Sequence, residues 1–182
     1  MNIIDYPDIR QKYFEGFDRA EEPNEIVIHG TGGGASADAI LKWMLNGERG
    51  ESYKKGIGLF HFLIDFDGTI YQIIEDYKWV YHSDAGKHDA KTIGIELMNN
   101  KSGNKGIIAD AQYNALSDII VDYVSKDVRI ISNHDANRKL YSGLGPKGCP
   151  GNFDFVYFYK MLAERLNFER ITDAKIAYVN LP

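Results

Sequence analysis

Short apolar runs of β-type residues alternate along this chain with segments whose apolar residues recur at helical spacing. The runs of the first kind are residues 25–28, 61–66, 69–74, 92–98 and 128–131, and those of the second kind are residues 36–45, 110–125 and 153–166. Because strands that alternate with helices favour a sheet covered by helices, we expect an α/β fold. The 182 residues suit a single domain, spanning 1–182, with a central mixed β-sheet flanked by helices. No pattern places the tail over residues 171–182.

Several local residue choices predict where these elements begin and end. Ser36 can cap a helix that Gly47 ends, and Asp110 can cap the next helix. The pair Asp67-Gly68 lies between two apolar runs and predicts a hairpin with a type I′ turn, which needs positive φ at both central residues. The many aromatics of the last helix indicate that it packs on the sheet. Polar or glycine-bearing stretches predict loops over residues 48–58, 77–91, 99–106 and 139–152.

The composition excludes several classes of protein. Hydrophobic residues make up 44% of the chain and charged residues 26%, which is ordinary for a globular protein, and the net charge of −5 disfavours binding to nucleic acid. No apolar run is long enough to cross a bilayer. Residues 1–17 carry scattered charges and no apolar core of a secretory signal. We therefore expect a protein that lies in the cytoplasm of the cell that makes it, at least before any release, and that does not insert into membranes. We expect it to be a monomer.

Two histidines and the single cysteine follow predicted strands or lie in a loop that can reach them. His29 ends the first strand, His134 follows the strand over 128–131, and Cys149 lies in the glycine-rich loop beyond. Ligand sites in open α/β sheets gather beyond the carboxyl ends of strands. Two imidazoles and a thiolate suit Zn²⁺, and three protein ligands leave a fourth coordination position open. The residues alone leave a second interpretation open, with two hydrogen-bonded structural histidines and a small buried cysteine.

Six short segments in a fixed order extend this pattern. They are Ile28–Thr31, Phe60–Ile64 with Asp67–Ile70, His82–Gly86, Ile93–Leu97, Asn133–Asp135 and Pro146–Pro150. This series resembles the type 2 N-acetylmuramoyl-L-alanine amidase family, which includes a bacteriophage lysozyme, the bacterial muropeptide-recycling amidase and the animal peptidoglycan recognition proteins. The resemblance covers about residues 26–155 and implies a zinc site at the strand ends.

The resemblance also implies roles for individual residues. His29, His134 and Cys149 correspond to the zinc ligands. Lys147 corresponds to the catalytic lysine of the family, and Glu96 to a glutamate in the active site of the recycling amidase. Two other interpretations stay open, because Glu96 could face solvent on one side of the sheet and Lys147 could be an ordinary exposed loop lysine.

Three further residues are expected to contact the substrate. His82 matches a histidine that recurs near the substrate groove of the family, and Trp79 offers an aromatic face for a glycan or a peptide, or else covers the core. Phe60 stands where the phage enzyme and the recognition proteins often carry a catalytic tyrosine, and it has no hydroxyl. The chain therefore resembles the recycling branch in its acid–base group and the phage branch in its cysteine ligand.

The resemblance implies hydrolysis of the amide bond between N-acetylmuramic acid and L-alanine of peptidoglycan, by a bacteriolytic endolysin of phage or prophage type. A cytoplasmic muropeptide-recycling amidase and a peptidoglycan-binding module without catalysis are the alternatives. Binding-only members of the family tend to lose the cysteine ligand, so Cys149, together with Lys147 and Glu96, favours the enzyme. Whether the substrate is the intact wall or a soluble muropeptide stays open.

Overall fold

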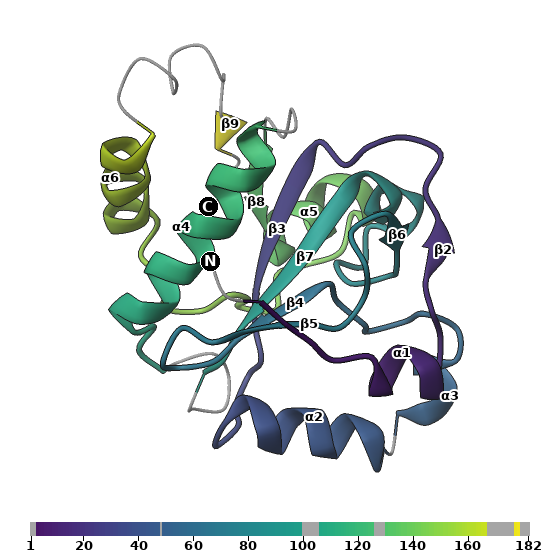
Figure 1. Cartoon of the computed structure of the whole chain (residues 1–182). Coiled ribbons are helices and arrows are strands. Elements are labelled where there is room, and N and C mark those ends of the chain that lie inside the picture. Colours follow the sequence, from purple (N-terminus) through teal and green to yellow (C-terminus); the bar gives the residue numbers. More distant parts are fainter. Residues whose placement is uncertain (1–2, 48, 100–105, 126–129, 167–176, 179–182) are drawn as a thin grey trace.

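The computed structural model describes residues 3–47, 49–99, 106–125, 130–166 and 177–178. It confirms an α/β domain with a mixed central sheet flanked by helices (Figure 1). The strands of this sheet, in spatial order, are β1 (Ile3–Asp5), β5 (Ile70–Gln72), β4 (Phe62–Ile64), β7 (Thr92–Leu97), β3 (Glu25–Gly30), β8 (Ile130–Asn133) and β9 (Ala177–Tyr178). A separate antiparallel pair consists of β2 (Phe17–Asp18) and β6 (Lys78–Trp79).

The strand directions bring several chain segments to one edge of the sheet. β3 lies in the centre and is parallel to both β7 and β8, and β4 is parallel to β7. The carboxyl ends of these four strands therefore meet at the same edge. β5 runs antiparallel to β4, β1 is parallel to β5, and β9 is parallel to β8. All six residues of β3 are buried, as a central strand with both faces covered requires.

Helices cover both faces of the sheet. The helices are α1 (Asp8–Lys12), α2 (Ala37–Leu45), α3 (Gly50–Tyr53), the 3₁₀ helix η1 (Gly86–Lys91), α4 (Asp110–Ser125), α5 (His134–Ser142) and α6 (Phe155–Arg165). On one face, Ile28 and Ile95 share a core with Leu116 of α4 and Phe158 of α6. On the other face, α1, α2 and α3 contribute the second core, in which Leu63 of β4 is buried. No helix among the described residues is long and apolar enough to span a membrane.

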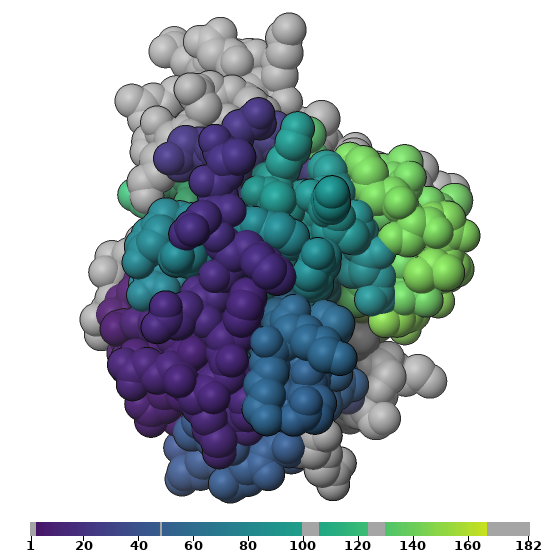
Figure 2. Space-filling view, turned by 90° about the vertical axis from the view of Figure 1, so that its right-hand side faces the viewer, coloured from purple at the N-terminus to yellow at the C-terminus, as the bar shows by residue number. Residues whose placement is uncertain are grey.

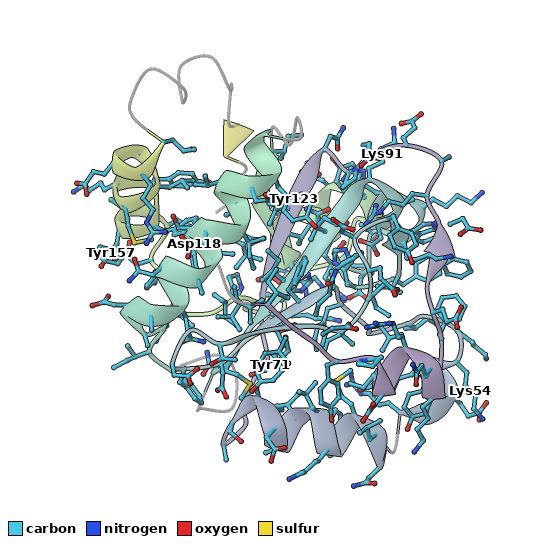
Figure 3. The ribbon with its side chains drawn as sticks, viewed as in Figure 1. Lys54, Tyr71, Lys91, Asp118, Tyr123 and Tyr157 are labelled. Atoms are coloured by element: carbon cyan, nitrogen blue, oxygen red, sulfur yellow. The ribbon has the colours of Figure 1, made fainter. Side chains whose placement is uncertain are left out.

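The three long predicted helices are present, and the last one packs mainly against α4. Ser36 caps α2, since its side chain accepts a hydrogen bond from the Ala39 N–H at 3.2 Å. α6 lies outside α4 (Figure 1). The Tyr157 hydroxyl donates to Asp110 at 3.1 Å, and Arg165 pairs with Asp118; Tyr157 and Asp118 are labelled in Figure 3. α6 also contributes Phe158 and Leu162 to the core that contains the sheet residues Ile28 and Ile131.

The predicted hairpin over β4 and β5 is confirmed, but its turn is of a different type. The Gly68 N–H donates to the Asp65 carbonyl at 3.0 Å, and Gly68 has φ of 85°. Asp67 does not have the positive φ that a type I′ turn needs, since Asp84 is the one non-glycine residue with positive φ in the described part of the chain. A three-residue loop with its left-handed residue at glycine explains this geometry. A Cβ at Gly68 would also lie 2.8 Å from the Ala111 carbonyl oxygen.

Three segments predicted as loops contain helices. α3 falls within the predicted loop over 48–58, η1 falls within the predicted loop over 77–91, and α5 extends to Ser142, into the predicted loop over 139–152. The Asn133 side chain caps α5 by accepting from the Ala136 N–H at 2.8 Å, and Gly143, with φ of 65°, ends it. α5 buries few apolar residues, so the apolar periodicity that reveals a helix is weak there. Residues 100–105 of the predicted loop over 99–106, residues 128–129 of a predicted strand, and all of the 171–182 tail except 177–178 lie outside the described residues.

Candidate active site

The three residues expected to bind a metal come together at the carboxyl edge of the sheet. His29 is the last residue but one of β3 and is 1% exposed. His134 begins α5 directly after β8. Cys149 is buried on the loop that follows α5. One ligand atom from each of the three lies within 4.8 Å of the others. Adjacent parallel strands explain the pairing of the histidines, and the returning loop supplies the sulfur.

The chemistry of these three donors fits a zinc ion. Burial lowers the pKa of His29 and His134, and the nearby His134 lowers that of His29 further, so both imidazoles are neutral and keep a lone pair. Burial raises the pKa of the Cys149 thiol, and Glu96 raises it further. The Gly30 N–H already points at the sulfur, 3.4 Å away. A bound cation supplies the charge that makes this buried thiol ionise, and two nitrogens with one sulfur are a zinc donor set.

Asp135 fixes the loop that carries the cysteine. Its carboxylate accepts three backbone N–H groups, from Lys147 at 2.7 Å, Gly148 at 2.8 Å and Cys149 at 3.2 Å. Asp135 is the neighbour of His134 in the chain, so one short segment places two of the three donors. The sequence analysis missed this role. An acidic residue directly after a candidate metal-binding histidine was the available signal.

Asp84 holds Lys147 beside the histidines. Its carboxylate accepts from Lys147 Nζ at 2.5 Å and from His134 Nε2 at 3.4 Å, and Arg138 also pairs with it. Burial opposes ionisation of Asp84, but the contacts with Lys147, His134 and Arg138 outweigh it and lower its pKa to about 2. Asp84 has φ of 56°, which is uncommon for a residue with a side chain. Nothing in the sequence analysis singled out Asp84, which lay in a segment predicted to be irregular.

Glu96 lies opposite His29 on β7 and lines the same pocket. Its Oε2 atom is buried and has no hydrogen-bond partner among the described residues. Burial raises the pKa of this carboxyl to about 8, and Arg49, which lines the same pocket, opposes the shift. A buried carboxyl oxygen without a partner in a pocket is the arrangement of a group that meets its partner on binding. The solvent-facing interpretation of Glu96 does not describe this environment.

The pocket has a volume of about 650 Å³ and collects residues from distant parts of the chain. Its walls include Arg49, Ile57 and Tyr81 besides Glu96 and Lys147. Figure 2 shows the contributing segments side by side on one face of the molecule: residues 49–59 in blue, 81–86 in teal and 134–149 in green. The sequence analysis missed Arg49 and Ile57, because an exposed loop cation and a single exposed aliphatic residue carry no local signal.

The three residues expected to contact substrate are placed differently from one another. His82 reaches the pocket, but both of its ring nitrogens already have partners, His29 at 3.0 Å and Thr92 at 2.7 Å. Phe60 is 6% exposed and belongs to the core beneath the pocket. Trp79 packs on Phe17, with ring centroids 4.5 Å apart, and does not line the pocket. Of the three, only His82 lines the pocket, and substrate contact by Phe60 and Trp79 stays a prediction.

The mixed sheet, the pocket at its carboxyl edge and the three converging donors define an α/β protein with a candidate metal-binding active site. Residues 19–152 match a family model described as N-acetylmuramoyl-L-alanine amidase, and the chain belongs to this family. The match covers the histidines, the cysteine, Glu96 and Lys147. It confirms the resemblance that the six ordered segments indicated. No curated protein sequence matches the chain.

Solved structures of low sequence identity share the fold. The amidase LysC from Clostridium intestinale is 20% identical with a TM-score of 0.61, over 92% of this chain and 98% of that one. An AmpD derivative is 20% identical with a TM-score of 0.61, over 87% of this chain and 93% of that one. PGRP-SA from Apis mellifera is 18% identical with a TM-score of 0.61, over all of both chains. At such identities these structures establish the fold alone.

Proposed function

We propose that this protein is a zinc-dependent N-acetylmuramoyl-L-alanine amidase, which hydrolyses the amide bond between N-acetylmuramic acid and L-alanine of peptidoglycan. The observation that carries the proposal is the convergence of His29, His134 and Cys149, within 4.8 Å of one another, in a pocket that also contains Glu96 and Lys147. Bound zinc would polarise the scissile carbonyl and lower the pKa of water.

Glu96 is suited to move the proton. Its Oε2 atom has no partner among the described residues, and the carboxyl faces the same pocket as the three donors. As the carboxylate it accepts the proton of the attacking water, and it then delivers that proton to the leaving amine. Burial raises the pKa of this carboxyl to about 8, and a cation held by the three donors would oppose that shift and favour the carboxylate.

Lys147 is suited to stabilise negative charge on the carbonyl oxygen. Its backbone N–H is held by Asp135, and its ammonium group by Asp84 at 2.5 Å. Both contacts keep the cation at the wall of the pocket before substrate arrives, so little reorganisation is needed during the reaction.

We propose an endolysin-type enzyme as the particular role, with peptidoglycan as the partner and a bacteriolytic effect on the wall. The name of the LysC structure, an amidase, and the name of a second match, the Ph2119 endolysin of a Thermus scotoductus bacteriophage, support this role. The AmpD match keeps a muropeptide-recycling role as the competing enzyme, and the PGRP-SA match keeps a recognition module as the competing binder. Cys149 and Glu96 in one pocket favour catalysis over binding alone.

Product analysis separates these functions. Purified protein with its zinc content measured is incubated with whole sacculi and, in parallel, with soluble muropeptides, and the products are identified by mass spectrometry. Release of free stem peptides from sacculi supports the endolysin, and cleavage of soluble muropeptides alone supports the recycling enzyme. Zinc bound at one equivalent with neither substrate cleaved would replace the amidase proposal by the recognition module. Glu96→Gln serves as the matched control, because it keeps the three metal donors.

A further inference from the structure

A run of hydrogen bonds leads from His29 away from the metal donors into the protein. His29 Nε2 lies 3.0 Å from His82 Nδ1, and His82 Nε2 lies 2.7 Å from Thr92 Oγ1. The Thr92 hydroxyl donates in turn to the backbone carbonyl of Asp89 at 3.1 Å. His29, His82, Thr92 and Asp89 are all buried, so water does not compete for these groups.

The end of this run determines the direction of every bond in it. The Asp89 carbonyl can only accept, so the single hydroxyl proton of Thr92 is committed to it. Thr92 Oγ1 must then accept from His82 Nε2–H. Each ring, as a buried neutral imidazole, carries one proton on one of its two nitrogens. His82 Nδ1 is therefore an acceptor, and the proton between the two rings belongs to His29 Nε2.

We propose that Thr92 is a positioning residue of the metal site: through His82 it holds the proton of His29 on Nε2, so that Nδ1 is the nitrogen offered to the ion. This inference rests on the proposed zinc site. His134 shows the same arrangement, because its Nε2 faces Asp84 at 3.4 Å. Metal-binding histidines commonly donate their other N–H to a fixed acceptor, which sets the tautomer and the orientation of the ring.

The packing of His82 supports the same role. A Cβ at Gly94 would lie 2.7 Å from Cγ and 2.8 Å from Nδ1 of His82, so the imidazole lies directly against the glycine of β7. Thr92, Gly94 and Glu96 alternate along β7 and thus face the same side. One face of β7 therefore provides the Thr92 hydroxyl that orients His82, the space at Gly94 for the His82 ring, and the Glu96 carboxyl that lines the pocket.

No other acceptor in the described surroundings replaces Thr92. Asp89 Oδ1 is 3.8 Å from His82 Nε2, beyond hydrogen-bonding distance. That carboxylate already accepts from the Ser83 hydroxyl and from the backbone N–H of His82 at 3.2 Å. Removing the Thr92 hydroxyl leaves His82 free to exchange its tautomer, and His29 then loses its preference for a proton on Nε2.

Zinc affinity of three variants tests the proposal. Thr92→Val keeps the shape of the side chain and removes the hydroxyl, Thr92→Ser keeps the hydroxyl, and Ser83→Ala removes a buried hydroxyl next to His82 that lies outside the run. Competition with a chromophoric chelator should show about 10–100-fold weaker zinc binding for Thr92→Val, the usual effect of losing an outer partner. Thr92→Ser and Ser83→Ala should stay within about threefold of the wild type. A folded Thr92→Val with wild-type affinity overturns the proposal.

Nitrogen NMR of the wild type provides a second test that does not depend on a variant folding. Long-range ¹H–¹⁵N spectra of the histidine rings are recorded with and without zinc. We expect His29 to be protonated on Nε2 with and without zinc. When zinc is added, the ¹⁵N chemical shift of His29 Nδ1 should change to that of a metal-bound nitrogen. A proton on His29 Nδ1, or a metal shift on Nε2, overturns the inference. If the wild type binds no zinc but His29 Nε2 carries the proton, the proposed function fails while the hydrogen-bond assignment stands.

Discussion

His29 and Glu96 are register partners on the adjacent parallel strands β3 and β7, so a candidate metal donor and a candidate proton acceptor share one row of the sheet. Both belong to central strands, whose backbone is fixed by hydrogen bonds on both sides. Glu96 can therefore act on a group bound beside His29 without a rearrangement of either strand. The roles of the two side chains in metal binding and in proton transfer can therefore be tested by separate substitutions.

Glu96→Gln should retain zinc and lower turnover about 10²–10⁴-fold, the usual scale for losing a general acid–base group. The amide keeps the size of the side chain and cannot accept the proton of the attacking water. Zinc content by atomic absorption and release of stem peptide from sacculi measure the two effects in the same preparation. Undiminished turnover in zinc-loaded Glu96→Gln would assign proton transfer to another group.

Cys149→Ala should abolish both zinc binding and amidase activity. The change removes one of three donors and leaves two histidines too few to hold the ion in a tetrahedral site. EDTA should inactivate the wild type in the same way, and added zinc should restore the wild type but not the variant. Retention of one zinc equivalent by Cys149→Ala would contradict the ligand set.

Asp135→Ala should weaken zinc binding by at least about tenfold, because the loop that carries Cys149 loses three hydrogen bonds to one carboxylate. The three donors would then no longer be held together before the ion binds. Chelator competition measures the affinity. Asp110→Asn, which alters a hydrogen bond between α4 and Tyr157 of α6 and lies outside the pocket, is the matched control and should bind zinc like the wild type. Equal affinities in both variants would exclude the anchoring role.

Glu25→Gln should lower the free energy of unfolding at neutral pH by about 1.5–3 kcal/mol, the range for hydrogen bonds to a charged group. Glu25 lies at the opposite end of β3 from the candidate site. Burial opposes its ionisation, but hydrogen bonds from His88 at 2.8 Å, from Asn137 at 2.6 Å and from Ser132 outweigh burial and lower its pKa.

The pH dependence of this effect has a definite sign. The native state favours the ionised form of Glu25, so its contribution is present above the pKa of the unfolded chain and is lost as pH falls through the lowered native pKa. Urea unfolding of the wild type and of Glu25→Gln between pH 7 and pH 3 measures the difference. The gap between the two should close toward acid pH, and a gap that widens there would show that the native pKa of Glu25 is raised.

Much of the fold follows from local patterns in the chain. The apolar runs predicted five strands of the central sheet but not β1 or β9, and helical periodicity together with Ser36 predicted α2 and the helices of the other face. α5 was not predicted, because its helical structure depends on the Asn133 cap and on its place beneath β8 more than on apolar spacing. The turn at Gly68 differed for a similar reason: Asp67-Gly68 is compatible with two turn types, and the backbone of Ala111 lies where only glycine fits.

The sequence by itself determined the residues with metal-binding chemistry, since His29 and His134 follow apolar strands and the six ordered segments are specific to one family. Only the tertiary structure decided which other side chains form hydrogen bonds with these residues or with the segments around them. Asp84, Asp135 and Thr92 are far from their partners in the chain or carry no distinctive local pattern. Their roles arise because parallel strands end at one edge, where the segments that follow them meet. Hydrogen-bond direction in a dry interior depends on every neighbour at once, and a linear pattern does not contain that information.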